Sequence, residues 1–108
     1  MSKLPYPVTE AFEATNAGDL ARFLAAFASD GVVDDSGREF RGHEKIAQWS
    51  RAESIGVKQT FLVTGTRENG DEVVVTAKVG GGGYNGPATF TFRLAPDGET
   101  IQRMAISG

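Results

Sequence analysis

The chain has 108 residues, of which 40% are hydrophobic, and a formal net charge of -3 at neutral pH. This length fits a single domain over residues 1–108, and an acidic balance without a run of lysines and arginines argues against a nucleic-acid partner. Because the chain has no cysteine and only one histidine, it offers no disulfide framework, no thiol nucleophile and no usual zinc site, so we expect neither a metal nor a cofactor.

The amino-terminal segment, residues 1–7, lacks the apolar core of a signal peptide. No apolar run approaches the roughly 20 residues of a membrane span. We therefore expect a cytoplasmic protein with no membrane partner. A domain this small gains stability when it buries further surface, so we also expect a homodimer.

The first third of the sequence has helical periodicity. Apolar residues recur at positions i, i+3, i+4 and i+7 through residues 8–15, and Gly18 is expected to end this helix. Asp19 is a suitable N-cap for a second helix. The apolar stripe of that helix covers residues 20–27, and the turn signal Asp30–Gly31 is expected to end it.

A short hairpin and a third helix are predicted next. Residues 32–35 are expected to form a strand, Ser36–Gly37 a turn and residues 38–41 the returning strand. A third helix then follows until about Ile55 and carries Trp49 on its apolar face.

The second half of the sequence alternates with a period of two, which is typical of strands. Residues 57–66 have a mixed pattern, and a hairpin turn is expected within residues 69–71. Three further strands are predicted near residues 73–79, 88–94 and 100–107. Such an antiparallel sheet needs helices over its apolar face. Its other face is rich in threonine, which suits either solvent or a sheet-to-sheet dimer contact.

Four groups of residues carry a resemblance to a known family. They are Asn16–Leu20, Phe27–Asp30 with Val33 and Asp35, Gly42 with Ile46 and Trp49, and Phe92–Arg93 with Met104. In these residues the chain resembles the SnoaL-like and nuclear transport factor 2-like superfamily, including its ketosteroid isomerase branch. The resemblance implies an α+β cone fold, in which a curved antiparallel sheet wraps around three N-terminal helices and a pocket lies between them.

The same resemblance places Asp35 where several pocket enzymes of the superfamily keep a catalytic acid or base. Side chains alternate along a strand, so if Val33 points into the cone then Asp35 does too, and Asp34 points outward. A carboxylate among apolar groups loses hydration, which favours its neutral form and suits acid–base work. The alternative is structural, because residues 34–37 also form a good turn sequence in which either aspartate can cap backbone donors.

A ketosteroid isomerase also needs a tyrosine and a protonated aspartic acid that donate to the enolate oxygen. In the matched segments these positions hold Ala11 and Phe90, and neither side chain can donate. The paired histidines of the branch that resembles scytalone dehydratase are also absent, since His43 is the only histidine. The polyketide cyclase branch, which asks chiefly for one acid or base in an apolar cavity, is contradicted least.

Seven side chains are candidates for contact with a small hydrophobic ligand. They are Phe12, His43, Trp49, Val75, Tyr84, Phe90 and Phe92. Several have a structural alternative: Trp49 suits core packing, His43 a capping or surface role, and Tyr84 an exposed turn. The four glycines at 80–83 indicate a bend or bulge, because a strand follows them where a phosphate-binding loop needs a helix and a lysine.

Two functions remain open from the sequence. The first is a small-molecule enzyme of acid–base isomerase or cyclase type, in which Asp35 exchanges a proton with a hydrophobic, carbonyl-bearing substrate. The second is a non-catalytic ligand-binding or dimerisation domain. A cavity filled by side chains would favour the second, whereas a pocket that ends on Asp35 opposite another polar group would favour the first.

Overall fold

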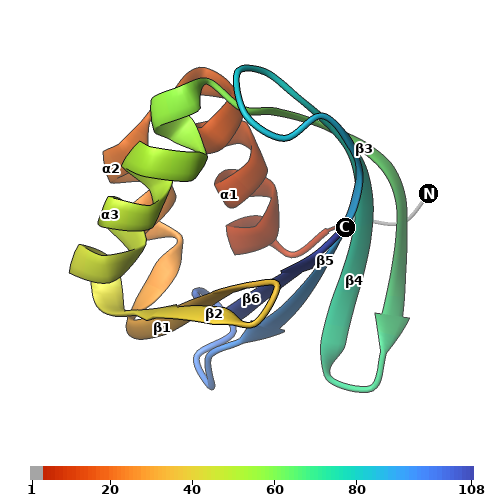
Figure 1. The fold of residues 1–108 in the computed structure, drawn as a ribbon. Coiled ribbons are helices and arrows are strands. Elements are labelled where there is room, and N and C mark those ends of the chain that lie inside the picture. The colour runs from red at the N-terminus through yellow and green to blue at the C-terminus, as the bar shows by residue number, and fades with distance from the viewer. Residues whose placement is uncertain (1–3) are drawn as a thin grey trace.

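Three helices lie within the curve of a six-stranded sheet in the computed structural model, which describes residues 4–108 (Figure 1). The helices are α1 (Tyr6–Ala17), α2 (Leu20–Ala25) and α3 (Gly42–Glu53), and a 3₁₀ turn, η1 (Ile55–Val57), follows α3. The strands are β1 (Phe27–Asp35), β2 (Arg38–Arg41), β3 (Thr60–Asn69), β4 (Glu72–Gly80), β5 (Gly86–Leu94) and β6 (Ile101–Ser107). The predicted α+β class, a curved sheet wrapped around three N-terminal helices, is confirmed.

The strands lie in the order β2-β1-β6-β5-β4-β3. Strands β3 to β6 form the predicted antiparallel meander, and the β1–β2 hairpin joins the sheet beside β6. The β1–β6 pair is parallel, whereas every other neighbouring pair is antiparallel. As a result β1 has a backbone partner on both sides, with Asp35 opposite Arg38 on β2 and Ile106 on β6.

Helix α1 buries its apolar stripe and ends at the glycine, as its sequence predicts. The apolar stripe of residues 8–15 is buried, including Phe12. Gly18 ends the helix in the left-handed region, at φ +72°, a conformation that glycine adopts without a steric penalty. Asp19 caps α2 as expected, since its Oδ1 accepts a hydrogen bond of 3.0 Å from the backbone N of Arg22.

Helix α2 is shorter than predicted. It ends at Ala25, and Phe27 to Asp30 belong to β1. The cause is pairing with the last strand: Phe27 lies opposite Ile101, whose backbone N donates to the carbonyl of Ala26 at 2.8 Å. The ring of Phe27 still packs on Phe23, 5.1 Å away between centroids. A side chain at helical spacing can thus reach the same core from an extended backbone.

The core between α1 and the sheet is built from phenylalanines. The ring of Phe12 meets those of Phe61, Phe90 and Phe92 nearly edge to face, with centroids 5.2–5.6 Å apart. Phe90 and Phe92 are both buried on the inner face of β5, as the alternation predicts. Each such aromatic pair adds attraction beyond the burial of its area, so Phe12 fixes the distance between α1 and the sheet.

Replacing Phe12 with alanine should therefore reduce the free energy of unfolding by about 3–5 kcal/mol, because it removes a buried ring and leaves a cavity. Urea denaturation measures the change. Tyr6→Ala on the same helix is the control, since that side chain is 73% exposed and its loss should cost less than about 1 kcal/mol. Equal losses in the two variants would contradict this account of the core.

Candidate functional site

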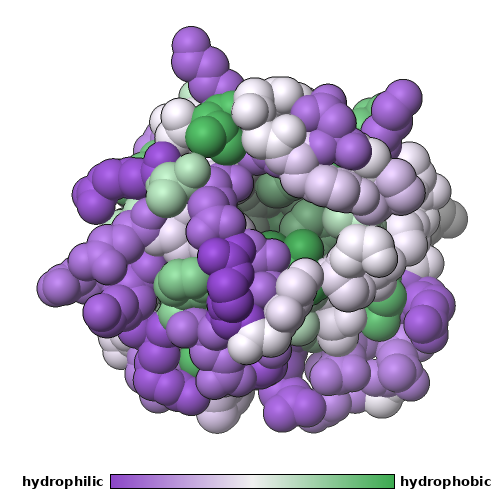
Figure 2. Space-filling model, in the orientation of Figure 1, coloured by the Kyte–Doolittle hydropathy of each residue, from purple (hydrophilic) through white to green (hydrophobic). Residues whose placement is uncertain are grey.

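A cavity of about 320 Å³ opens between the helices and the sheet. Seen in the orientation of Figure 1, this face is hollowed near its centre, with apolar residues in the depth and hydrophilic residues along much of the rim (Figure 2). Its volume lies at the small end of the usual range for ligand pockets, about 300–1,000 Å³. The lining consists of Asp35, Ser36, Arg38, Trp49, Glu53, Ser54, Gln59, Phe61, Val79, Tyr84, Ala88, Phe90, Ile106 and Gly108.

One wall of the cavity is apolar and comes from the sheet. It consists of Phe61 on β3, Val79 on β4, Ala88 and Phe90 on β5, and Ile106 on β6. These side chains belong to the inner face that also packs on α1. The opposite wall is polar and comes from the β1–β2 hairpin and the end of α3. A bound molecule would therefore meet an apolar surface on one side and hydrogen-bonding groups on the other.

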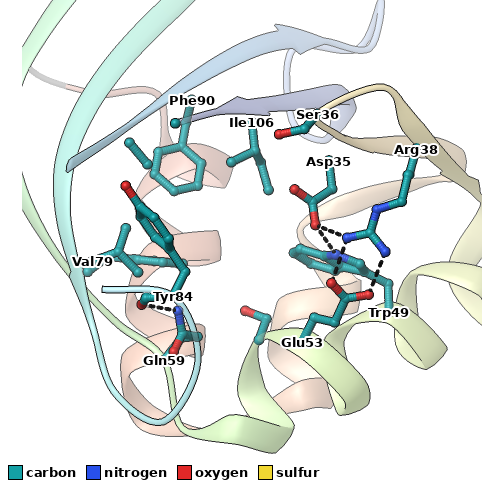
Figure 3. Close-up of a pocket in the computed structure, with 14 residues that line it drawn as sticks. Asp35, Ser36, Arg38, Trp49, Glu53, Gln59, Val79, Tyr84, Phe90 and Ile106 are labelled. Atoms are coloured by element: carbon teal, nitrogen blue, oxygen red, sulfur yellow. Dashed lines mark hydrogen bonds and ion pairs between the residues drawn. The ribbon is translucent and has the colours of Figure 1, made fainter. Parts of the chain in front are cut away.

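Asp35 lies at the end of β1, with its side chain 22% exposed and its carboxylate directed at the cavity (Figure 3). Its Oδ2 accepts two hydrogen bonds, from the indole N of Trp49 at 3.0 Å and from Nη2 of Arg38 at 2.7 Å. Within residues 4–108 no protein group donates to its other oxygen, Oδ1. One carboxylate oxygen is thus held in place while the other is available to a ligand.

Asp34, the neighbour of Asp35, takes the turn role that either aspartate could have filled. Its Oδ1 accepts a hydrogen bond of 2.7 Å from the backbone N of Gly37. Its Oδ2 accepts from Arg103 on β6, which also pairs with Glu39 at 2.9 Å. Asp34 therefore closes the hairpin on the outer side, and Asp35 is not needed for the turn.

Arg38 links the hairpin to α3. Its guanidinium binds both oxygens of Glu53, at 2.6 and 2.9 Å, while it also contacts Asp35. The hydrogen bond from Arg38 lowers the pKa of Glu53, and the same contact raises the pKa of Arg38. The guanidinium also lies 5.7 Å from the ring centroid of Phe40. We call these three charged residues the Asp35–Arg38–Glu53 network.

The glycine-rich loop at 80–83 is attached to the segment after α3. Buried Gln59 donates to the carbonyl of Tyr84 at 2.9 Å and accepts from the backbone N of Gly83 at 2.7 Å. Gly81 has a φ of +112°, and a Cβ at this position would lie 2.3 Å from the carbonyl O of Lys58. Glycine is required here because two backbone segments approach this closely.

Tyr84 follows this loop and lies across the cavity from Asp35 (Figure 3). Its side chain is 52% exposed, and its hydroxyl donates to the carbonyl of Pro87 at 2.7 Å. The ring is therefore held along the cavity mouth by a bond within its own turn.

The structure brings together half of the residues that the sequence proposed for the site. Asp35, Trp49, Tyr84 and Phe90 line the cavity, whereas Phe12, His43, Val75 and Phe92 are not part of the lining. His43 begins α3 and has its Nε2 3.0 Å from the carbonyl O of Phe27. The other three are buried in the core around α1.

Several lining residues were not found from the sequence. Arg38 was not among the candidates, although the predicted turn at Ser36–Gly37 places it directly opposite Asp35, and that register was a usable signal. Ser54 and Gln59 lie at the end of α3 and after η1, where no periodicity marks an inner face.

Among residues 4–108 no group of three or more histidine, cysteine, aspartate or glutamate side chains is placed to hold a metal ion. In the same part of the chain, no helix combines the length and the apolar character needed to cross a bilayer.

A comparison with models of protein families shows the family to which this chain belongs. The model of the SnoaL-like domain matches residues 8–104. The chain belongs to this SnoaL-like family. No curated protein matches the chain. The family assignment therefore rests on a match over most of the sequence.

Solved structures with the same fold include proteins of different activities. A candidate polyketide cyclase from Sinorhizobium meliloti is 27% identical, with a TM-score of 0.82 over 96% of this chain and 95% of that one. The Δ5-3-ketosteroid isomerase of a Mycobacterium species is 20% identical, with a TM-score of 0.77 over 94% and 89% of the two chains. The canthaxanthin-binding orange carotenoid protein of Anabaena is 22% identical, with a TM-score of 0.81 over 98% of this chain and 37% of that one.

Gly81→Ala tests the attachment of the loop. The variant should lose clearly more unfolding free energy than Gly98→Ala, which has a positive φ of +70° but nothing within 4 Å of its Cβ. The control is expected to lose about 1–2 kcal/mol from the backbone conformation alone. Chemical denaturation of both variants gives the difference. Losses of the same size would show that the loop does not need its close approach to Lys58.

Proposed function

We propose that this SnoaL-like domain is an acid–base enzyme of isomerase or cyclase type that acts on a small, mostly apolar, carbonyl-bearing molecule. The observation that carries the proposal is the geometry of Asp35. Its Oδ2 is fixed by Trp49 and Arg38, and its Oδ1 faces a cavity with an apolar wall. A base held in this way is oriented before substrate arrives, which lowers the entropic part of the barrier.

The proposed step is removal of a proton from the carbon next to a carbonyl group. Oδ1 of Asp35 accepts the proton, the electron pair of the C–H bond forms the C=C bond of an enolate, and the carbonyl π pair moves to oxygen. In a β,γ-unsaturated ketone the enolate is conjugated with the neighbouring C=C bond, and return of the proton to the γ carbon, with a shift of the C=C bond to the α,β position, completes an isomerisation. Alternatively, the enolate carbon attacks a second carbonyl of the same molecule, the π pair of that carbonyl moves to its oxygen, and the alkoxide takes the proton back from Asp35, which completes a cyclisation. The proton transfer uses side-chain groups alone.

Ligand contacts in this proposal come from the cavity lining. Phe90 and Tyr84 offer ring surface to an apolar ligand, and Trp49 offers the edge of its indole while it holds Asp35. Phe12 and Phe92 do not contact the ligand in this proposal. They pack next to Phe90 in the core and support its ring. The similarity to a candidate polyketide cyclase and to a ketosteroid isomerase supports this type of substrate.

A second candidate is a domain that binds an apolar ligand without turnover. Two observations favour it. Phe90 stands at a position where the resembled isomerases need a hydrogen-bond donor, and it contributes only its ring to the cavity. The carotenoid-binding relative also has this fold. The two candidates differ in whether Asp35 is needed for a chemical step or only for the shape and polarity of the pocket.

The homodimer and the cytoplasmic location stay predictions. The outer face of β3 and β4 exposes Thr64 and Thr76, which suits a hydrated contact between two sheets. Sedimentation velocity at micromolar concentration should therefore give the mass of two chains, and a single-chain mass would contradict the dimer. Fractionation of the producing cells tests the location.

Asp35→Asn tests the proposed base. The variant keeps the size of the side chain but cannot take up the proton, so turnover should fall by at least about 100-fold. The assay follows exchange of the α-protons of 2-tetralone, a neutral bicyclic ketone, for deuterium by NMR. Circular dichroism and calorimetry check the fold and the binding of the ketone.

Asp34→Asn is the matched control, because this carboxylate closes the hairpin on the outer side and contacts no ligand in the proposal. It should keep the exchange rate. An Asp35→Asn variant with the full rate would end the enzyme proposal. If the wild type and both variants bind the ketone but none of them exchanges its α-protons, the second candidate is favoured.

A further inference from the structure

Two buried side-chain polar atoms within residues 4–108 have no hydrogen-bond partner, and both are serine hydroxyls on the same helical segment. Ser50 lies inside α3, away from the cavity lining. Ser54, which is 2% exposed, ends α3 and lines the cavity. Buried hydroxyl groups in proteins are nearly always paired. Because Ser54 lines the cavity, rotation of its side chain can bring this buried hydroxyl to a ligand that supplies the missing partner.

The backbone of Ser54 is firmly held. Its N donates to the carbonyl of Ser50 at 3.0 Å, and its own carbonyl accepts from the backbone N of Val57 and of Gln59, both at 3.1 Å. Only rotation about the side-chain torsion remains free. A ligand that accepts from this hydroxyl restricts that torsion only, which costs little conformational freedom.

The other donors of the cavity are already in use or exposed. Four lining side chains donate to protein oxygens, namely Arg38, Trp49, Gln59 and Tyr84. The hydroxyl of Ser36 lies in the exposed turn after β1. Among the described lining residues, Ser54 thus has the buried hydroxyl that remains uncommitted. It can donate to an oxygen of a bound molecule.

The charge of the lining restricts that molecule further. The ionised side chains are those of the Asp35–Arg38–Glu53 network, two carboxylates and one guanidinium. Both carboxylates already bind the guanidinium. An anionic ligand would meet a net negative wall without a free cation, and a cationic ligand would find both carboxylates already paired with Arg38, so the cavity suits a neutral ligand.

We propose that Ser54 donates its hydroxyl to the carbonyl oxygen of a neutral, apolar ketone and holds the neighbouring carbon toward Asp35. This inference rests on the proposed function and names its substrate class. As Asp35 takes the proton, the C–H electron pair becomes the C=C bond and the carbonyl oxygen gains negative charge, so the hydrogen bond from Ser54 strengthens. Ser54 then fills the donor role that neither Ala11 nor Phe90 can fill.

Ser54→Ala and Ser50→Ala are the variants that test the proposal. Each removes one unpaired buried hydroxyl from the same segment, but only Ser54 lines the cavity. The probes are 2-tetralone and tetralin, which have the same two fused rings and differ by the carbonyl group. Calorimetry gives the affinities, NMR gives the deuterium exchange, and thermal unfolding shows whether each variant is folded.

Ser54→Ala should bind 2-tetralone roughly 2- to 12-fold more weakly, the range expected for one neutral hydrogen bond. Its kcat for exchange should fall roughly 100-fold, as for loss of an oxyanion donor. Tetralin binding should not change. Ser50→Ala should match the wild type with both probes, because its hydroxyl faces no ligand.

The outcomes separate this inference from the proposed function. If Ser54→Ala keeps the wild-type affinity and exchange while Asp35→Asn loses exchange, the role of Ser54 is overturned and the enzyme proposal stands. If no form exchanges but Ser54→Ala alone loses the preference for 2-tetralone over tetralin, the ligand class is supported and the enzyme proposal fails. If the wild type has no such preference, or does not bind 2-tetralone, the ketone assignment is overturned.

Discussion

The pairing of β1 with both β2 and β6 is the constraint on which the site depends. Asp35 comes from the first third of the chain, whereas the apolar wall of the cavity comes largely from the last strands. The parallel β1–β6 ladder joins these distant segments and sets Asp35 beside Ile106. Because backbone hydrogen bonds lie on both sides of β1, the sheet fixes the face from which this side chain leaves the strand.

The Asp35–Arg38–Glu53 network contributes orientation more than stability. Arg38 is 55% exposed and Glu53 40% exposed, and ion pairs at such positions add little to the free energy of folding. Their geometry still matters. The guanidinium of Arg38 binds Glu53 and Asp35 at the same time, and this keeps Oδ2 of Asp35 in one place. The hydrogen bond from buried Trp49 adds a second fixed point. The same wall thus holds one oxygen and leaves the other accessible.

Features that depend on local periodicity could be predicted from the sequence. The buried stripe of α1, the cap at Asp19 and the strand at residues 38–41 follow from neighbours a few positions apart. The early end of α2 could not, because Phe27 satisfies helical spacing as well as pairing with Ile101, and only the distant strand decides between them. The parallel placement of β1 is non-local in the same way.

In the candidate site, too, only the features that depend on a local pattern could be predicted. Strand alternation was enough to direct Asp35 inward, and the cavity does end on it. The partners of Asp35 required the hairpin register and the packing of α3, which no single segment encodes. Ser54 and Gln59 come from an aperiodic segment, and Gln59 is placed by its hydrogen bonds to the glycine-rich loop, which is distant in the sequence.

The position of Asp35 on one wall of the cavity also has a consequence for the stereochemistry of the proposed reaction. A flat molecule between the sheet and the hairpin would present only one of its two faces to Oδ1, because the apolar wall covers the other. Removal and return of hydrogen by the same oxygen would then take place on that face alone. In the proposed reaction, the asymmetry of the two walls would therefore yield one mirror form of a chiral product.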